Sequence, residues 1–222
     1  MRLPASERKA QILRTAAELF SQQGYEGTKT SQIAREAGVN EAIIFRHFNN
    51  KEDLYWAVLS DSCSMVSLKT HLKDVMDPER SPEEGLTALA HFVLERVCRH
   101  QQLSRLLLFA ALENHKLSHR FFKLYTANKY EELADYIRRQ ARRGLFRADV
   151  DPLLAARGFF GMLIYHFQIQ ELYGGKTVQQ FDLRHVSATF VRLWLRGMEA
   201  SEFTFAHSKL RSTAEGRAVA VE

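Results

Sequence analysis

Apolar residues recur along this chain at spacings of three and four, which is the period of an α-helix with one buried face. Ile12, Ala16 and Phe20 have this spacing near the start, and comparable runs continue to about residue 197. Alternation of apolar and polar residues, the signature of a strand, is absent. Four prolines and eleven glycines in 222 residues leave long stretches without helix breakers. The pattern predicts an all-α fold.

Helix-start signals divide this pattern into separate helices. Such a start is marked by a polar side chain that can accept a backbone hydrogen bond, strengthened by a following proline or by an acidic or amide side chain three residues on. The signals stand at Ser6, Thr30, Asn50, Ser81-Pro82-Glu83-Glu84, Asp151-Pro152 and Thr177 with Gln180. The predicted helices cover residues 6–24, 31–37, 40–47, 50 onward, 82–100, 103–114, 118–143, 152–174 and 178–197.

The two short helices predicted between residues 30 and 47 meet the requirements of a helix-turn-helix. Ala34 is small enough for the second helix to cross the first, and Gly38 tolerates the left-handed dihedrals of the turn. The start of the second helix would enter the major groove of DNA. Apolar residues available to face the preceding helix are Ile33, Ala37, Val39, Ile44 and Phe48.

Charge is unevenly distributed in a way that suits this interpretation. The first 51 residues carry eight Lys and Arg against five Asp and Glu, so they hold +3 of the net charge of +5. Mild basicity at one end fits a phosphate-binding head on a nearly neutral body.

Several classes of protein are excluded. No run approaches the roughly 18 apolar residues of a membrane span, and the start lacks the apolar run of a secretory signal. Cys63 and Cys98 are far apart and form no zinc-binding spacing, which predicts reduced thiols in a cytoplasmic protein. No nucleophile–base arrangement and no phosphate-binding loop occur, so we expect neither an enzyme nor a cofactor.

The head also carries a pattern typical of a known family. The run GYEGTKTSQIAREAGVNEAIIFRHFNNKEDL, residues 24–54, resembles the TetR family of bacterial repressors, as does the ILRTAAELF run of residues 12–20. This resemblance covers about the first 60 residues and matches many positions at fixed spacing. The matching positions include Gly24-Tyr25, Thr28, Ile33-Ala34, Ala37-Gly38-Val39, Phe45, His47-Phe48 and Lys51-Glu52.

The resemblance implies an omega-shaped dimer of chains with about nine helices. In the family, helices 1–3 bind DNA, helices 4–7 enclose a ligand pocket, and helices 8–9 form the dimer interface. We accordingly expect a DNA-binding domain over residues 6–66, with its helix-turn-helix at about 29–48. A ligand-binding and dimerisation bundle would follow over residues 67–200, and a flexible tail over 201–222.

The resemblance also assigns DNA-contacting roles. Thr30 and Lys51 correspond to positions that contact phosphates. Phe45 stands where the family usually has a tyrosine that donates to phosphate, and here that hydroxyl is missing. At the base-facing start of the recognition helix, Ala42 and Ile43 suggest apolar contact with thymine methyl groups. The full predicted DNA-binding set is Thr30, Asn40, Glu41, Ala42, Ile43, Phe45, Arg46, His47 and Lys51.

Most of these assignments have a structural alternative. Thr30 could serve only as a helix cap, and Glu41 only as a first-turn carboxylate that complements the helix dipole. Ile43 and His47 could belong partly to the core. Lys51 could be an ordinary solvated cation.

The middle of the chain is rich in aromatic residues, most of which fit a close-packed core. A minority, interleaved with polar side chains, could line a pocket for a small hydrophobic or amphipathic effector. Glu113, His115 and His119 resemble a metal set, but a predicted helix break near Ser118 would separate them, so no metal is expected. The predicted pocket lining is Phe92, Arg96, Phe109, Glu113, Phe122, Tyr125, Met162, Tyr165 and His166.

The last two predicted helices carry more apolar surface than one bundle face needs. A helix that is apolar nearly all round must be buried on several sides, which favours a four-helix interface between two chains over a monomeric core. The predicted interface residues are Leu154, Gly158, Gly161, Phe190, Trp194 and Gly197.

Together these features predict a homodimeric regulator of transcription that binds double-stranded operator DNA. A small effector bound in the bundle would release a repressor from a palindromic operator. The alternative is a DNA-binding regulator without a small ligand, controlled by a protein partner or by its own concentration.

Overall fold

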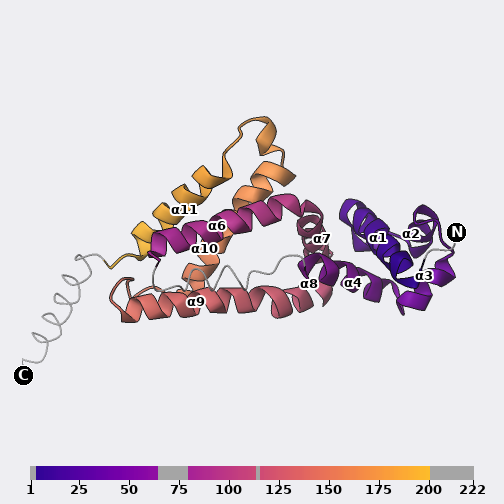
Figure 1. Cartoon of the computed structure of the whole chain (residues 1–222), viewed down its shortest axis with the longest axis horizontal. Coiled ribbons are helices and arrows are strands. Elements are labelled where there is room, and N and C mark those ends of the chain that lie inside the picture. The colour runs from indigo at the N-terminus through magenta and orange to yellow at the C-terminus, as the bar shows by residue number, and fades with distance from the viewer. Residues whose placement is uncertain (1–3, 65–79, 114–115, 201–222) are drawn as a thin grey trace, which may run out of the picture. The chain divides into compact units, whose positions relative to one another are not determined.

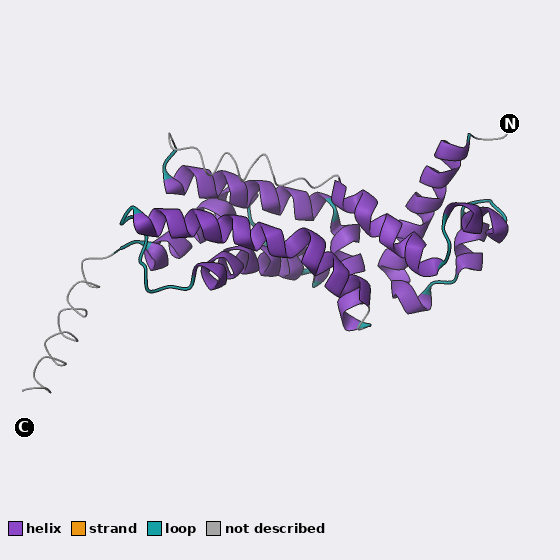
Figure 2. Ribbon diagram, turned by 90° about the horizontal axis from the view of Figure 1, so that it is seen from below, coloured by secondary structure: helices purple, strands orange, loops and turns teal. Residues whose placement is uncertain are grey.

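A computed structural model describes residues 4–64, 80–113 and 116–200. Within these ranges every regular element is helical, which confirms the predicted all-α fold (Figure 2). A single antiparallel bridge pairs Phe146 with Glu199. None of the described helices combines the length and the hydropathy that crossing a bilayer requires.

The chain divides into two compact units. Among the described residues, the first joins 4–64 to 95–113 and 116–128, and the second joins 80–94 to 129–200. Residues 95–128, which the sequence placed in the bundle, therefore group with the head. The expected boundary at residue 66 and the tail over 201–222 lie outside the described residues.

In the first unit, α1 lies at the centre and contacts α2, α4 and α7 (Figure 1). Its predicted apolar stripe of Ile12, Ala16 and Phe20 is completely buried. Burial of each large side chain of this kind contributes about 1.5–3 kcal/mol. The elements of this unit are α1 (Ala5–Gly27), α2 (Thr30–Glu36), α3 (Glu41–His47), α4 (Lys51–Ser64), the end of α6 (Pro82–Arg99), α7 (Gln101–Leu112), α8 (Lys116–Phe121) and a π-helical turn, η1 (Phe122–Thr126).

The predicted caps of the head are partly confirmed. Asn50 Oδ1 accepts the Asp53 N–H at 2.8 Å, as expected. The cap at Ser6 is wrong, because α1 already begins at Ala5 after the N-cap position Pro4. The cap at Thr30 is also wrong, because α2 begins with this residue and its hydroxyl bonds elsewhere.

In the second unit, α10 packs against α11 (Figure 1). Trp194 packs edge-to-face with Phe146 and Phe159 at centroid distances of 5.8 and 5.6 Å, and all three side chains are buried. The elements are the first part of α6, most of α9 (Ala127–Arg142), α10 (Pro152–Phe167), a π-helical turn η2 (Gln168–Leu172), a 3-10 turn η3 (Gly175–Thr177) and α11 (Leu183–Met198).

The strongest start signals of this unit are confirmed. The Glu84 N–H donates to Ser81 Oγ at 3.3 Å, and the Ser81 N–H donates to the Glu84 carboxylate at 3.2 Å, which makes a capping box. The Asp151 carboxylate accepts the Leu154 N–H at 2.8 Å before Pro152.

Two predicted elements are wrong. The helix expected over 118–143 begins instead with α8 and is interrupted by η1 before α9 continues it. The start signal at Thr177 does not open the last helix, because the Thr177 hydroxyl donates to the Gly174 carbonyl oxygen at 2.7 Å. The cap of α11 is Asp182, whose carboxylate accepts the His185 N–H at 2.9 Å.

Candidate nucleic-acid interface

Helices α2 and α3 form a helix-turn-helix whose turn is made by Gly38 at a φ of +63°. A side chain other than glycine is strained at that dihedral, so the residue type decides the turn. Ile33 and Ile44 are buried on the inner faces of the two helices. Their burial holds the other faces of α3 in a fixed orientation.

The exposed start of α3 presents a fixed polar group. Asn40 is its N-cap, and the Asn40 side-chain oxygen accepts the Ala42 N–H at 2.9 Å. Because the oxygen serves the cap, the amide NH₂ group is the part of the side chain that the predicted base contact would use. Asn40 and Ala42 are both exposed, as a base-reading position requires.

The other predicted residues of α3 divide between solvent and core. Phe45 is 46% exposed, and Arg46 is exposed as well. Ile43 is half-buried and packs against the core of the unit, so its alternative role is supported in part. His47 is half-buried beside Phe48, with ring centroids 6.3 Å apart.

Two predicted DNA-contacting residues are bonded to each other. The Thr30 hydroxyl of α2 donates to the Glu41 carboxylate of α3. This bond gives Glu41 a local partner in addition to the helix dipole at the start of α3.

Lys51, the predicted phosphate contact, lies over an aromatic ring. Its ammonium nitrogen is 4.2 Å from the centroid of the Tyr25 ring, a cation–π geometry. Burial raises the pKa of the Tyr25 hydroxyl, and the charges of Glu52 and Glu26 raise it further. The sequence indicated Lys51 but not the ring that holds it, because that contact joins separate elements.

The predicted pocket residues do not all gather in one unit. Glu113 bonds to the N-terminal head, since its carboxylate accepts the Tyr25 N–H at 3.1 Å. In the other unit, the His166 ring meets the edges of Phe181 and Phe190, and burial lowers its pKa. The predicted pocket residues of the first unit are Arg96, Phe109, Glu113, Phe122 and Tyr125. Those of the second unit are Phe92, Met162, Tyr165 and His166. Of the candidate metal set, His115 lies outside the described residues.

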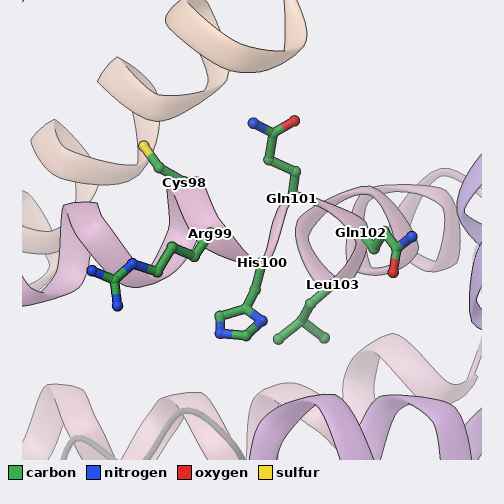
Figure 3. Close-up of a pocket in the computed structure, with 6 residues that line it drawn as sticks. All are labelled: Cys98, Arg99, His100, Gln101, Gln102 and Leu103. Carbon is green, nitrogen blue, oxygen red and sulfur yellow. The ribbon is translucent and has the colours of Figure 1, made fainter.

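Two hollows lie elsewhere in the described chain. One, of about 310 Å³, is at the junction of α6 and α7, where six consecutive side chains from Cys98 to Leu103 spread in different directions (Figure 3). Burial and the charges of Arg96 and Arg99 lower the pKa of His100 there. The other, of about 540 Å³, lies between α6 and α11 and is lined by Glu83, Glu84, Thr87, Ala88, His91, Arg184 and Ala188. Neither hollow is lined by a predicted pocket residue, so the effector pocket stays a prediction.

One face of α10 carries exposed apolar and small residues at helical spacing. Leu154 and Tyr165 are 64% and 62% exposed, and Gly158 and Gly161 lie between them with open space around each. On α11, Leu193 is 58% exposed, and Gly197 also faces open space. Phe190 is half-buried beside His166.

Trp194, in contrast, is buried within its own chain. Its indole N–H donates to the Ala155 carbonyl oxygen at 3.1 Å. Its side chain therefore stabilises the packing of α10 on α11 and offers little surface to a second chain.

Comparison with known proteins shows to which family this chain belongs. The profile of the bacterial regulatory proteins of the tetR family matches residues 12–58, which contain the helix-turn-helix. The profile of the C-terminal domain of AefR-like transcriptional repressors matches residues 84–197, more than half of the 222-residue chain. The chain belongs to the TetR family. This TetR-family protein is a DNA-binding transcriptional regulator and not an enzyme.

Several relatives match this TetR-family protein over most of its length. An HTH-type transcriptional regulator of Staphylococcus aureus strain USA300 is 26% identical over 202 residues, covering 91% of this chain and 97% of the relative. AibR, solved with isovaleryl coenzyme A and operator DNA, has a TM-score of 0.64 at 24% identity and covers 84% and 97% of the two chains. FadR of Bacillus subtilis, solved with stearoyl-CoA, has a TM-score of 0.65 at 21% identity and covers 85% and 98%. The two structural likenesses confirm the fold.

Proposed function

We propose that this TetR-family regulator is a homodimeric repressor that acts in the cytoplasm and leaves its operator when an acyl-coenzyme A binds the C-terminal bundle. One observation carries the proposal. The chain joins a helix-turn-helix with an exposed α3 to a C-terminal segment that matches AefR-like transcriptional repressors.

The exposed apolar face of α10 and α11 supports the homodimer. Leu154, Tyr165 and Leu193 each expose more than half of their surface, which is costly for large apolar side chains left in water. The glycines between them would let a second copy approach closely. A two-fold dimer presents two copies of α3, so its operator would be an inverted repeat with half-sites about one helical turn apart or somewhat more.

The class of effector is supported by two relatives of the same fold. AibR was solved with isovaleryl coenzyme A, and FadR of Bacillus subtilis with stearoyl-CoA. An acyl chain suits the aromatic residues predicted for a pocket, and the charged coenzyme A group suits polar side chains at its mouth. This agrees with the amphipathic effector expected from the sequence.

The test begins with operator fragments selected from a random DNA pool and footprinted. Fluorescence anisotropy then measures operator affinity while isovaleryl-CoA or stearoyl-CoA is added. We expect one acyl-CoA to raise the melting temperature and to weaken operator binding by about 5- to 150-fold. By linkage, the operator should weaken binding of that acyl-CoA by the same factor. Coenzyme A alone and free stearate are the matched controls.

The alternative function makes a different prediction in the same assay. A regulator controlled by a protein partner or by its own concentration would bind the inverted repeat with an affinity unaffected by every acyl-CoA tested. A footprint over a single unrepeated site would contradict the dimeric repressor itself.

A further inference from the structure

Helix α1 is broken at Gly24, and the break exposes backbone groups that need partners. Gly24 has a φ of +75° and a ψ of −179°, so the helix resumes only as a short turn ending at Gly27. In an uninterrupted helix the Tyr25 N–H would donate to the Ser21 carbonyl oxygen. The non-helical dihedrals of Gly24 interrupt this regular pattern, and half-buried backbone groups need hydrogen-bond partners.

Helix α7 and its C-cap supply a partner on each side of the break. The Glu113 carboxylate accepts the Tyr25 N–H at 3.1 Å and the Glu26 N–H at 3.4 Å. Arg105 Nε donates to the Ser21 carbonyl oxygen at 2.9 Å. An anion accepts from the N–H groups and a cation donates to the carbonyl oxygen, which is the complementary choice at each position.

Gly24 is also required for this fit. A Cβ atom added at residue 24 would collide with the Glu113 carboxylate and touch Phe109. The carboxylate can approach the backbone only because no side chain stands there. A further bond, from the Tyr55 hydroxyl to the Leu106 carbonyl oxygen at 2.7 Å, fixes α7 to α4 as well.

The contact continues from Tyr25 to the predicted DNA surface. The Tyr25 ring packs edge-on against Tyr55 and stacked against Phe20, with centroids 5.3 and 6.2 Å apart. The Lys51 ammonium lies over the same ring, 4.2 Å from its centroid. An ammonium has three N–H donors, so it can rest on the ring and still donate to a phosphate.

We propose that Glu113 is a positioning residue for DNA binding: it holds the backbone of Tyr25, whose ring holds Lys51 toward the phosphate backbone. The inference rests on the proposed phosphate contact of Lys51. Glu113 lies in the segment that matches the C-terminal repressor domain, yet it bonds the DNA-binding head. It therefore connects the regulatory part of the sequence to a DNA contact.

A positioning role and a simple charge effect of Glu113 predict opposite changes in DNA affinity. Removing the Glu113 carboxylate makes the protein more positive, which by itself strengthens binding to phosphates. A positioning role predicts the opposite, weaker binding. Glu26→Gln is the matched control, because it removes the same charge from an exposed neighbouring residue and leaves its backbone N–H in place.

The experiment measures operator affinity against salt concentration at a temperature well below the melting point of every variant. Lys51→Ala should weaken binding about tenfold and lower the salt slope by about one unit. Glu113→Ala should also weaken binding and lower the slope, by up to the Lys51→Ala effect. In the Lys51→Ala background, Glu113→Ala should cause no further loss. Glu26→Gln should bind equally well or more tightly.

Hydrogen exchange gives a readout independent of DNA. The backbone amides of Tyr25 and Glu26 should exchange faster in Glu113→Ala than in the parent. If Glu113→Ala does not fold, Glu113→Gln replaces it, because the neutral amide oxygen accepts more weakly while the side-chain length is kept. This variant should show a smaller loss of affinity in the same direction.

The outcomes separate the inference from the function on which it rests. If Lys51→Ala lowers the slope but Glu113→Ala and Glu113→Gln bind as well as the parent, the positioning role is overturned and the phosphate contact stands. If the losses of operator affinity from Lys51→Ala and Glu113→Ala add in the double variant, the positioning role is overturned as well. If Lys51→Ala leaves the slope unchanged, the phosphate contact fails, and the inference fails with it.

Discussion

The Thr30 hydroxyl donates a hydrogen bond to the Glu41 carboxylate, and this bond joins the two helices of the helix-turn-helix. Both residues were expected to face DNA. Their pairing shows that side chains of the predicted DNA-binding surface also bond to each other. This bond adds to the buried Ile33 and Ile44 in holding α3 on α2, and single substitutions can remove it.

Thr30→Val should reduce the free energy of unfolding by about 1 kcal/mol, since it keeps the side-chain shape and removes the hydroxyl donor. Urea denaturation of the free protein measures the change. Ser31→Ala removes a hydroxyl from the neighbouring exposed residue and should leave the urea midpoint unchanged. Equal stability of Thr30→Val and the parent would show that the bond contributes nothing to folding.

Substitutions at Asn40 should separate its cap from its contact with DNA. Asn40→Ala removes the acceptor of the Ala42 N–H and should cost about 0.5–2 kcal/mol of stability. Asn40→Ser keeps a capping oxygen, so its stability should stay near that of the parent, but it loses the amide that would read a base. Its binding to the operator should weaken by about 1–3 kcal/mol, and the loss should depend on particular base pairs. Anisotropy on single-base operator variants measures this dependence. Full operator affinity in Asn40→Ser would argue against a base contact.

Leu193→Asp should convert the proposed dimer to folded monomers. Leu193 is 58% exposed on α11, so the charge is solvated in a free chain but desolvated in an interface. Light scattering gives the mass, and circular dichroism checks the fold. Leu124→Asp is the matched control, because Leu124 is an exposed leucine outside α10 and α11. Trp194→Asp should instead unfold the protein, since the ring is buried within one chain. A dimeric Leu193→Asp would place the interface elsewhere.

His166 should make the second unit less stable in mild acid. Burial lowers its pKa from the ordinary value of 6.5, so the unfolded chain takes up a proton at a higher pH than the native chain does. The contribution of neutral His166 is complete above about pH 6.5 and is lost as the pH falls from there through the native pKa. The urea midpoint should therefore drop between about pH 7.5 and 5.5, and His166→Phe should reduce that drop. His185→Phe, at an exposed position of α11, should leave the drop as it is in the parent.

Short-range signals correctly predicted three of the six proposed caps. The caps at Asn50, Ser81 and Asp151 were predictable because each bond joins atoms three residues apart. Thr177 was misleading for the same reason, since its hydroxyl found another local acceptor and Asp182 took the cap. Sequence spacing shows which residues are able to cap, and packing of the chain decides which of them does.

The family and the helix-turn-helix were recognisable because Gly38 and the apolar residues of α2 and α3 act over a few positions along the chain. The partner of Glu113 was not recognisable, because the Tyr25 N–H lies 88 residues away and is available only where Gly24 breaks α1. A polar residue among aromatics looks the same in sequence whether it anchors a ligand or a backbone. Only the packing of α7 on α1 brings that carboxylate to its donors, because a hydrogen bond depends on distance in space and not on spacing in the chain.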